Sequence, residues 1–334
     1  MKGGGKRFNA AEDLMKAIWL ENNMLSFRQD VPPPTPSEIE ALVRVRMAGI
    51  CGTDLELIKG YYRYCGIPGH EFVGDIIEAP QQPQRIGERV VGDINVSCGT
   101  CSSCSLGQPM HCETRKILGI KGHHGVLAEY VCLPLKNLIS VPDSVSDDAA
   151  VFVEPLAAAL EIQSQIEIQP QHQVLVVGAG RLGQLIAQTL AVTECHLQVV
   201  ARYQKQKQLL TAHNITWIDE TSVTKRRYDV VVEATGSPSG FAVAHRAVRP
   251  RGIIVLKSTY QSEVSINLSS LVVDEVTLMG SRCGSLRPAL DLIERGIIDP
   301  VDLIEKCYLL KQAPTAFEHA ARPGVLKILV KVVD

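Results

Sequence analysis

The sequence lacks several features that would assign it to whole classes of protein. No apolar run approaches the ~18 residues that a bilayer-spanning helix needs. The formal net charge is −2, so there is no basic excess of the kind typical of nucleic-acid-binding proteins. Residues 1–14 contain glycines and basic residues but no apolar core, so they do not resemble a secretory signal peptide. We therefore expect a cytoplasmic protein with no membrane or nucleic-acid partner, and a loosely ordered extension over residues 1–14.

Ten cysteines are present, and four of them are clustered. In a reducing compartment, clustered thiols more often bind metal than form disulfides. The cluster follows the spacing Cys98-x2-Cys101-x2-Cys104-x7-Cys112, which suits a tetrahedral zinc ion and differs from the usual spacings of iron–sulfur ligands. Four thiolates close the coordination shell, so the spacing predicts a structural zinc rather than a catalytic one.

The pattern of apolar residues changes part-way along the 334-residue chain, which is long enough for about two domains. Residues 15–150 contain short apolar stretches broken by proline and glycine, which is typical of a β-rich domain. From about Pro170, apolar strands alternate with helical segments, which favours a doubly wound parallel sheet. The tail after about Pro300 is expected to return to the first domain. We predict an α/β protein with a catalytic domain over 15–158 and 292–334, and a dinucleotide-binding domain over 159–291.

A glycine-rich turn follows the first apolar strand of the second domain. Gly178 allows the tight turn, Gly180 lets the backbone approach a pyrophosphate, and Gly183 permits close helix–strand packing. The helix that begins here favours negative charge at its N-terminus. We predict that the turn binds a dinucleotide through Gly178, Gly180, Arg181, Leu182 and Gly183.

The end of the next strand is expected to select between NAD and NADP. An acidic residue there would bind the ribose 2′-hydroxyl of NAD, but the sequence runs Val200-Ala201-Arg202-Tyr203-Gln204-Lys205 without a carboxylate. A guanidinium can pair with a 2′-phosphate. We predict a preference for NADP, with Arg202 as the main residue that binds the 2′-phosphate and Lys205 as a second one. The alternative is that Arg202 stacks on the adenine without selecting a cofactor.

A second set of metal-ligand residue types is dispersed along the first domain. It comprises Cys51-Gly52-Thr53-Asp54, then Gly69-His70-Glu71, then Glu154-Pro155. One thiolate, one imidazole and one carboxylate would leave a coordination position for substrate, as a catalytic zinc requires.

These motifs, taken in order, resemble the zinc-containing medium-chain alcohol dehydrogenase family, in its polyol, glucose and threonine dehydrogenase branch. The resemblance implies a GroES-like catalytic domain, a Rossmann domain and two zinc ions per chain. It further implies that Cys51 and His70 bind the catalytic zinc, with Glu71 or Glu154 as the third protein ligand.

The resemblance also suggests roles for three residues next to the ligands. Thr53 would accept the alcohol proton, and Asp54 would orient the His70 ring. The alcohol-specific branch has a relay histidine five residues after the first ligand, a position occupied here by Glu56, which becomes a third catalytic candidate.

The expected reaction is hydride transfer between a small alcohol, polyol or sugar and NAD(P). Two alternatives are a zinc-free quinone or enone reductase on the same fold and a non-catalytic sensor that binds NADP. The resemblance implies a homodimer or homotetramer, with dimers formed through the edge strand near Val276–Met279.

Overall fold

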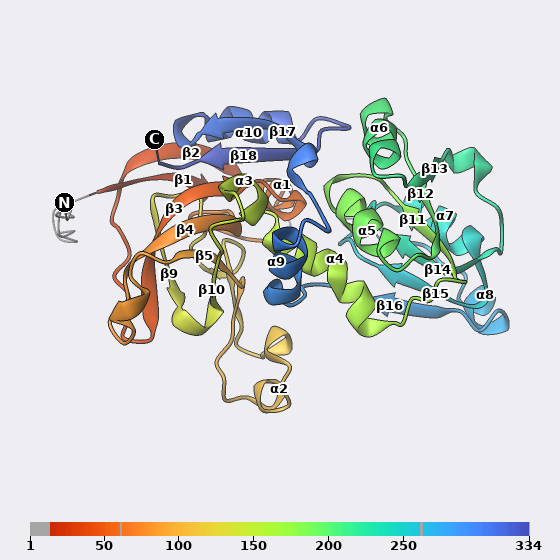
Figure 1. Cartoon of the computed structure of the whole chain (residues 1–334), viewed down its shortest axis with the longest axis horizontal. Helices are drawn as coiled ribbons and strands as arrows, with labels where there is room; N and C mark the ends of the chain where they lie inside the picture. Colours follow the sequence, from red (N-terminus) through yellow and green to blue (C-terminus); the bar gives the residue numbers. More distant parts are fainter. Residues whose placement is uncertain (1–13, 61, 261–262, 334) are drawn as a thin grey trace. The chain divides into compact units, whose positions relative to one another are not determined.

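The computed structural model describes residues 14–60, 62–260 and 263–333 (Figure 1). Of the predicted extension over 1–14, only Leu14 lies within the described residues. The chain divides into two compact units. The first contains the chain up to Phe152, Lys306–Ala321 and the segment from Lys327, and the second contains Val153–Glu305 and Arg322–Leu326.

The unit boundaries differ from the sequence-based ones, which placed 153–158, 292–305 and 322–326 in the first domain. The reason is helix packing. Helix α4 (Val153–Gln165) contacts α5 (Arg181–Ala191) and α9 (Leu286–Glu294), so all three helices belong to the second unit.

The first unit is β-rich, as expected, and is built around a seven-stranded sheet. Its order is β10-β5-β4-β3-β18-β17, and β9 also pairs with β3. Strand β18 comes from the C-terminal tail and pairs antiparallel with β3, so the predicted return of the tail is observed. The sheet strands are β3 (Glu40–Gly49), β4 (Glu71–Glu78), β5 (Arg89–Gly92), β9 (Tyr130–Pro134), β10 (Leu138–Ser140), β17 (Ile304–Leu309) and β18 (Lys327–Lys331).

Smaller elements complete this unit. Strands β1 (Met15–Glu21) and β2 (Met24–Val31) form an antiparallel pair, and β6 (Asn95–Val96), β7 (Lys116–Leu118) and β8 (Gly122–His123) form a three-stranded sheet. A lobe that includes α2 leaves this small sheet and returns to it, and it projects from the unit in Figure 1. The helices are α1 (Gly52–Ile58), α2 (Ser102–Ser105), α3 (Asp147–Ala150) and α10 (Ala313–Ala320).

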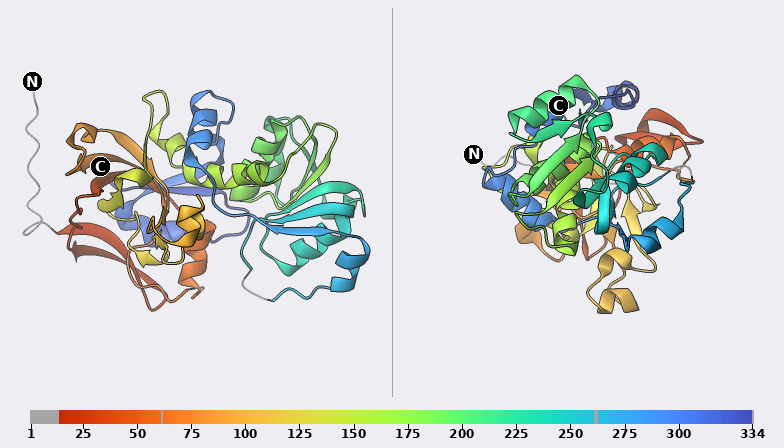
Figure 2. Two further views of the ribbon diagram at one scale, coloured as in Figure 1. Left: turned by 90° about the horizontal axis from the view of Figure 1, so that it is seen from below. Right: turned by 90° about the vertical axis from the view of Figure 1, so that its right-hand side faces the viewer.

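The second unit contains the predicted parallel sheet, with six strands in the order β13-β12-β11-β14-β15-β16. Figure 2 shows helices on both of its faces, which makes it doubly wound. The strands are β11 (Gln173–Val177), β12 (His196–Val200), β13 (Thr216–Ile218), β14 (Tyr228–Glu233), β15 (Val248–Leu256) and β16 (Thr277–Gly280). The remaining helices are α6 (Gln204–Ala212), α7 (Pro238–Ala247) and α8 (Leu268–Val273).

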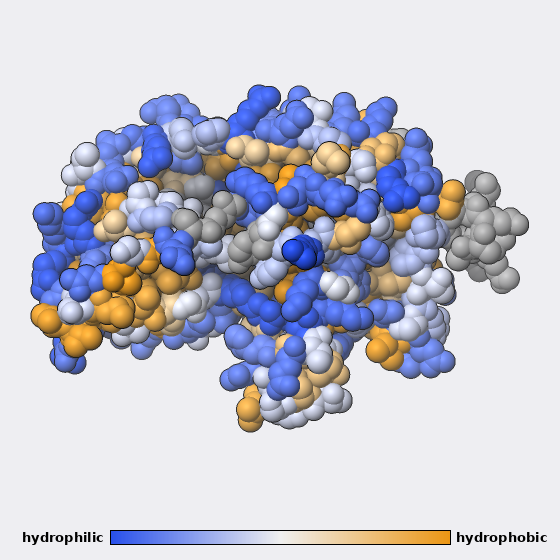
Figure 3. Space-filling model, turned by 180° about the vertical axis from the view of Figure 1, so that it is seen from behind, coloured by the Kyte–Doolittle hydropathy of each residue, from blue (hydrophilic) through white to orange (hydrophobic). Residues whose placement is uncertain are grey.

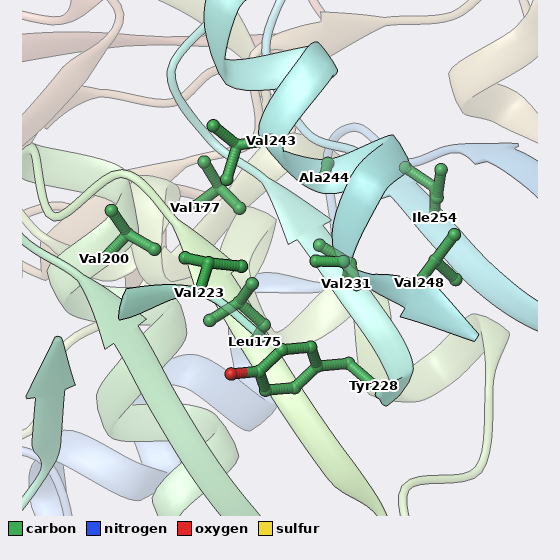
Figure 4. Close-up of a cluster of buried hydrophobic side chains, with 11 residues drawn as sticks. Leu175, Val177, Val200, Val223, Tyr228, Val231, Val243, Ala244, Val248 and Ile254 are labelled. Carbon is green, nitrogen blue, oxygen red and sulfur yellow. The ribbon is translucent and has the colours of Figure 1, made fainter. Parts of the chain in front are cut away.

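Burial on both faces explains why the central strands are continuously apolar. Side chains alternate between the faces of a strand, so Leu175 and Val177 of β11 point to the same face and pack with Val231 of β14 and Val243 of α7 (Figure 4). Val174 and Val176 lie on the opposite face and are also fully buried. This packing holds the carboxyl ends of β11, β12 and β14 at one edge of the sheet. Among the described residues, no helix is both long enough and apolar enough to span a membrane.

Candidate active site and metal centres

The four-cysteine lobe brings its thiols together as predicted. The sulfur atoms of Cys98, Cys101, Cys104 and Cys112 all lie within 4.8 Å of one another. Neighbouring sulfurs are separated by 3.5 Å (Cys98 to Cys112), 3.6 Å (Cys101 to Cys104) and 4.0 Å (Cys98 to Cys104). A tetrahedral zinc with bonds of ~2.3 Å places its sulfurs ~3.8 Å apart. The spacing therefore fits zinc and is too long for disulfides.

Electrostatics in the lobe also favour a bound cation. Backbone N–H groups of Thr100 and Cys101 point at the Cys98 sulfur, and these hydrogen bonds lower the pKa of Cys98 to about 5. Burial and the neighbouring Cys101 thiol instead raise the pKa of Cys104 to about 11. The chain by itself therefore stabilises some of the thiolates but not all of them. A divalent cation would supply the positive charge needed to stabilise the remaining thiolates.

The dispersed ligand candidates also converge. Cys51 is the residue before α1, His70 immediately precedes β4, and Glu71 is the first residue of β4. One ligand atom from each of the three lies within 4.8 Å of the other two. His70 and Glu71 are almost completely buried, and Glu71 Oε1 has no hydrogen-bond partner. A buried carboxylate oxygen without a partner costs free energy unless a cation binds it, so the donor set fits a metal ion.

Asp54 holds the loop and the helix of this cluster together. Its carboxylate is fully buried and accepts hydrogen bonds from the backbone N–H of Cys51 (2.9 Å) and of Gly69 (3.3 Å). Its Oδ1 lies 3.3 Å from His70 Nδ1, close enough to orient the imidazole ring. Burial alone would lower the pKa of His70, but the nearby Asp54 and Cys51 outweigh burial and raise it well above its usual value.

A buried lysine beside Glu71 was missed by the sequence reasoning. Lys327 Nζ lies 2.5 Å from Glu71 Oε2, and the two side chains are 2% and 1% exposed. Gly49 lies opposite Glu71 in the β3–β4 ladder, and a Cβ atom there would collide with Glu71 Oε2. One Glu71 oxygen is thus held by Lys327 while the other remains for a metal. Since Lys327 lies 256 positions from Glu71, no local pattern could have revealed the pair.

Thr53 and Glu56 share one face of α1, because they are three residues apart in a helix. Thr53 Oγ1 lies 3.8 Å from the Cys51 sulfur. Glu56 Oε1 pairs with Lys59 at 3.0 Å, and its Oε2 is buried without a hydrogen-bond partner. Glu154 lies near the start of α4 in the second unit, so its assignment as a zinc ligand stays a prediction.

The glycine turn of the second unit has the geometry of a phosphate-binding turn. Gly178 has a φ of +105°, a conformation that side chains rarely adopt. A Cβ on Gly183 would collide with the Gly178 carbonyl, whereas a Cβ on Gly180 would meet nothing within 4 Å. Helix α5 starts at Arg181, whose Nε donates to the Leu326 carbonyl at 2.8 Å. The backbone at Gly180 is therefore open to a ligand at a helix N-terminus.

Two buried polar side chains, also missed in the sequence, lie beside this turn: Gln184 in α5, and Glu233 opposite Val177 on the neighbouring strand. Gln184 Nε2 donates to the carbonyls of Ala179 (3.3 Å) and Gln206 (3.2 Å), which ties the turn to α6. Glu233 ends β14 and accepts hydrogen bonds from Thr235 N (2.7 Å) and Gly236 N (3.2 Å).

Arg202 and Lys205, the residues predicted to contact the adenosine ribose, lie after β12. Each of them forms an ion pair with a carboxylate. Arg202 Nη2 lies 3.7 Å from Glu220 Oε2, and Lys205 Nζ lies 3.3 Å from Glu305 Oε2. Arg202 is largely exposed and so can reach a ligand. Lys205 is held by an acidic residue that also accepts the Leu326 N–H at 2.9 Å.

Comparison with known proteins agrees with this geometry. Residues 37–143 match the alcohol dehydrogenase GroES-like domain, and residues 147–288 match the glucose dehydrogenase C-terminus. The L-threonine 3-dehydrogenase of Chelativorans sp. (strain BNC1) is 31% identical over 70% of this chain and 72% of its own length. The chain belongs to the zinc-containing medium-chain alcohol dehydrogenase family.

Solved structures of zinc-type and alcohol dehydrogenases have the same fold. A putative zinc-binding dehydrogenase from Sinorhizobium meliloti 1021, bound to NADP, superimposes with a TM-score of 0.88 at 28% identity and covers 96% of this chain and all of that one. The rspB alcohol dehydrogenase of Escherichia coli CFT073, complexed with NADH, has the same TM-score and coverage at 29% identity. This medium-chain dehydrogenase is therefore a nicotinamide-dependent enzyme with a GroES-like and a Rossmann domain.

Proposed function

We propose that this enzyme oxidises a small polar alcohol, or reduces the matching carbonyl compound, at a zinc ion held by Cys51, His70 and Glu71. Two observations carry the proposal, in a chain that also contains a nucleotide-binding turn. One ligand atom each of Cys51, His70 and Glu71 converge within 4.8 Å, and Glu71 Oε1 is buried without a hydrogen-bond partner. Zinc at this site would act as a Lewis acid toward the substrate oxygen. The ligand set disfavours a zinc-free reductase.

The protein groups around the ligands have separate roles in this proposal. Asp54, whose Oδ1 lies 3.3 Å from His70 Nδ1, would orient the imidazole so that its other nitrogen could bind the metal. The Thr53 hydroxyl would accept the proton of the substrate alcohol and release its own hydroxyl proton. The Glu56 carboxylate, on the same face of α1, would take up the released proton and pass it to solvent. Lys327 holds Glu71 Oε2 and leaves Oε1 as the oxygen that could bind the metal.

Glu71 is the third ligand that the observations favour, and Glu154 is the alternative. Glu71→Gln should lower catalytic zinc content at least as much as Glu154→Gln, because a Glu71 carboxylate oxygen lies within 4.8 Å of ligand atoms of Cys51 and His70. The opposite order would assign the role to Glu154.

NADP is the proposed cofactor, since Arg202 is exposed at the end of β12 and no carboxylate precedes it on that strand. A polyol, sugar or other polar alcohol is the proposed substrate class. The match to the glucose dehydrogenase model and the similarity to an L-threonine 3-dehydrogenase support it. We also propose the cytoplasm as the compartment, because thiols that cluster at metal sites are typical of a reducing compartment.

Zinc content and turnover together test the function. The purified chain should contain two zinc ions and should oxidise at least one member of a panel of sugars, polyols and simple alcohols with NAD or NADP. Cys51→Ala should retain one zinc and lose turnover. Cys132→Ala, in which a buried cysteine of β9 is removed, is the matched control and should retain two zinc ions and normal turnover. Normal turnover in Cys51→Ala would refute the proposal.

A homodimer formed by β16 is also proposed. This strand is the edge of the six-stranded sheet, so its outer backbone groups face no neighbouring strand of that sheet. Apolar side chains gather beside it (Figure 3): Leu278 of β16 is 42% exposed, and Val272 and Val273 of α8 are 76% and 80% exposed. A second copy pairing edge to edge would cover both features.

A further inference from the structure

The carboxyl ends of β12 and β13 lie side by side in the second unit. The strands are parallel, with Val200 opposite Ile218, and the backbone N–H of Ala201 donates to the Ile218 carbonyl at 3.2 Å. Arg202 is the second residue after β12, and Glu220 is the second residue after β13. Their side chains consequently meet beyond the edge of the sheet, with Arg202 Nη2 3.7 Å from Glu220 Oε2.

Neither side chain of this pair contributes much to packing. The Arg202 side chain is 73% exposed and that of Glu220 is 48% exposed. The backbone beneath Arg202 is better fixed, because Tyr203 N–H donates to Gln206 Oε1 at 3.3 Å and Gln206 is itself tied to the glycine turn through Gln184. The charged groups of Arg202 and Glu220 are therefore exposed beside the end of β12, the second strand of the Rossmann sheet. Sheets of this kind bind the adenosine ribose at that position.

We propose that Glu220 is a cofactor-specificity residue, which supplies from β13 the carboxylate that the end of β12 lacks. This inference rests on the proposed nicotinamide site and deepens it. With NAD, the Glu220 carboxylate accepts a hydrogen bond from the ribose 2′-hydroxyl. With NADP, it repels the 2′-phosphate and competes with that phosphate for the Arg202 guanidinium.

The neighbouring Lys205 does not change the competition between Glu220 and a 2′-phosphate for the Arg202 guanidinium. Lys205 is paired with Glu305, and the same carboxylate accepts the Leu326 N–H, so the acidic group is held in place beside it. Asp219, beside Glu220, is paired with Lys207 at 2.7 Å. Arg202 is therefore the cation that can turn toward a 2′-phosphate, and Glu220 is the acidic group that opposes this. The preference for NADP is expected to be moderate, and NAD should remain a usable cofactor.

Substitution of Glu220 by glutamine tests the assignment in the full chain. Titration of NADPH and NADH against purified protein, followed by nucleotide fluorescence, gives the ratio of the two dissociation constants without any need for a substrate. Removal of one negative charge near a 2′-phosphate should shift this ratio toward NADPH by roughly fivefold in Glu220→Gln. Arg202→Gln should shift it in the opposite direction.

Glu275→Gln is the matched control, because Glu275 forms a similar exposed pair with Arg251, at 3.4 Å, in the same unit. It should leave the ratio unchanged. If Glu220→Gln leaves the ratio within twofold of the wild type, or weakens both nucleotides equally, the assignment is overturned while the proposed function stands. If the wild type binds neither nucleotide, the proposed function is overturned and this inference with it.

Discussion

The ion pair between Lys327 and Glu71 should be needed for the stability of the catalytic unit. Lys327→Met removes the positive charge and leaves the Glu71 carboxylate, which is 1% exposed, buried without its partner. Removal of one member of a buried ion pair costs roughly 3–5 kcal/mol. For a domain of this size, a loss of ~3 kcal/mol corresponds to a fall of about 6–12 °C in the melting temperature.

A double-mutant cycle separates the ion pair from simple packing. Glu71→Gln/Lys327→Met contains no buried charge at this position, so it should melt at a higher temperature than Lys327→Met alone. Lys331→Met is the matched control: it changes a lysine of the same strand that is exposed, and its effect should stay within about 0.5 kcal/mol.

Differential scanning calorimetry on the purified variants after removal of zinc with a chelator provides the measurement. The metal must be absent from every variant because Glu71 is also a proposed zinc ligand. Two results would refute the reasoning. One is a melting temperature in Lys327→Met equal to that of the control. The other is a double variant whose loss equals the sum of the two single losses, which would mean that the two side chains do not interact.

The remaining predictions concern the zinc lobe, a buried lysine and the sheet edge. Cys98→Ser should lose one zinc per chain, by metal analysis, and should unfold at a lower temperature, whereas Cys132→Ser should keep both zinc ions; two zinc ions in Cys98→Ser would contradict the structural site. Burial lowers the pKa of Lys257 from 10.5 to about 8. Between these two values the unfolded chain binds more protons than the folded chain, so the free energy of unfolding rises with pH, and Lys257→Met should weaken that rise in urea titrations at pH 8 and 10. An identical pH dependence in the variant would exclude this role. Leu278→Glu places a charge on the exposed edge strand and should shift the protein toward monomers in light scattering; an unchanged mass would place the interface elsewhere.

The local features of this protein followed from the sequence by itself. The four cysteines lie within 15 residues, so a short loop is enough to bring their sulfurs together. The glycine turn also depends on neighbours in the chain, because a side chain at Gly183 would collide with the carbonyl of Gly178, five residues earlier. The continuous apolar runs of β11 and β14 were enough to predict buried strands, because both faces of those strands are covered.

Pairings between distant segments were decided by the tertiary structure. Every second residue of β18 points to the same face, which places Lys327, Leu329 and Lys331 together. Lys327 is nevertheless buried, whereas Lys331 is exposed. Only the register of β18 against β3, with Leu329 opposite Gly49, brings Lys327 to the Glu71 carboxylate. Glu220 likewise meets Arg202 only because β13 lies beside β12. Strand order and register determine such charge pairs, and neither can be read from the spacing of residues within one segment.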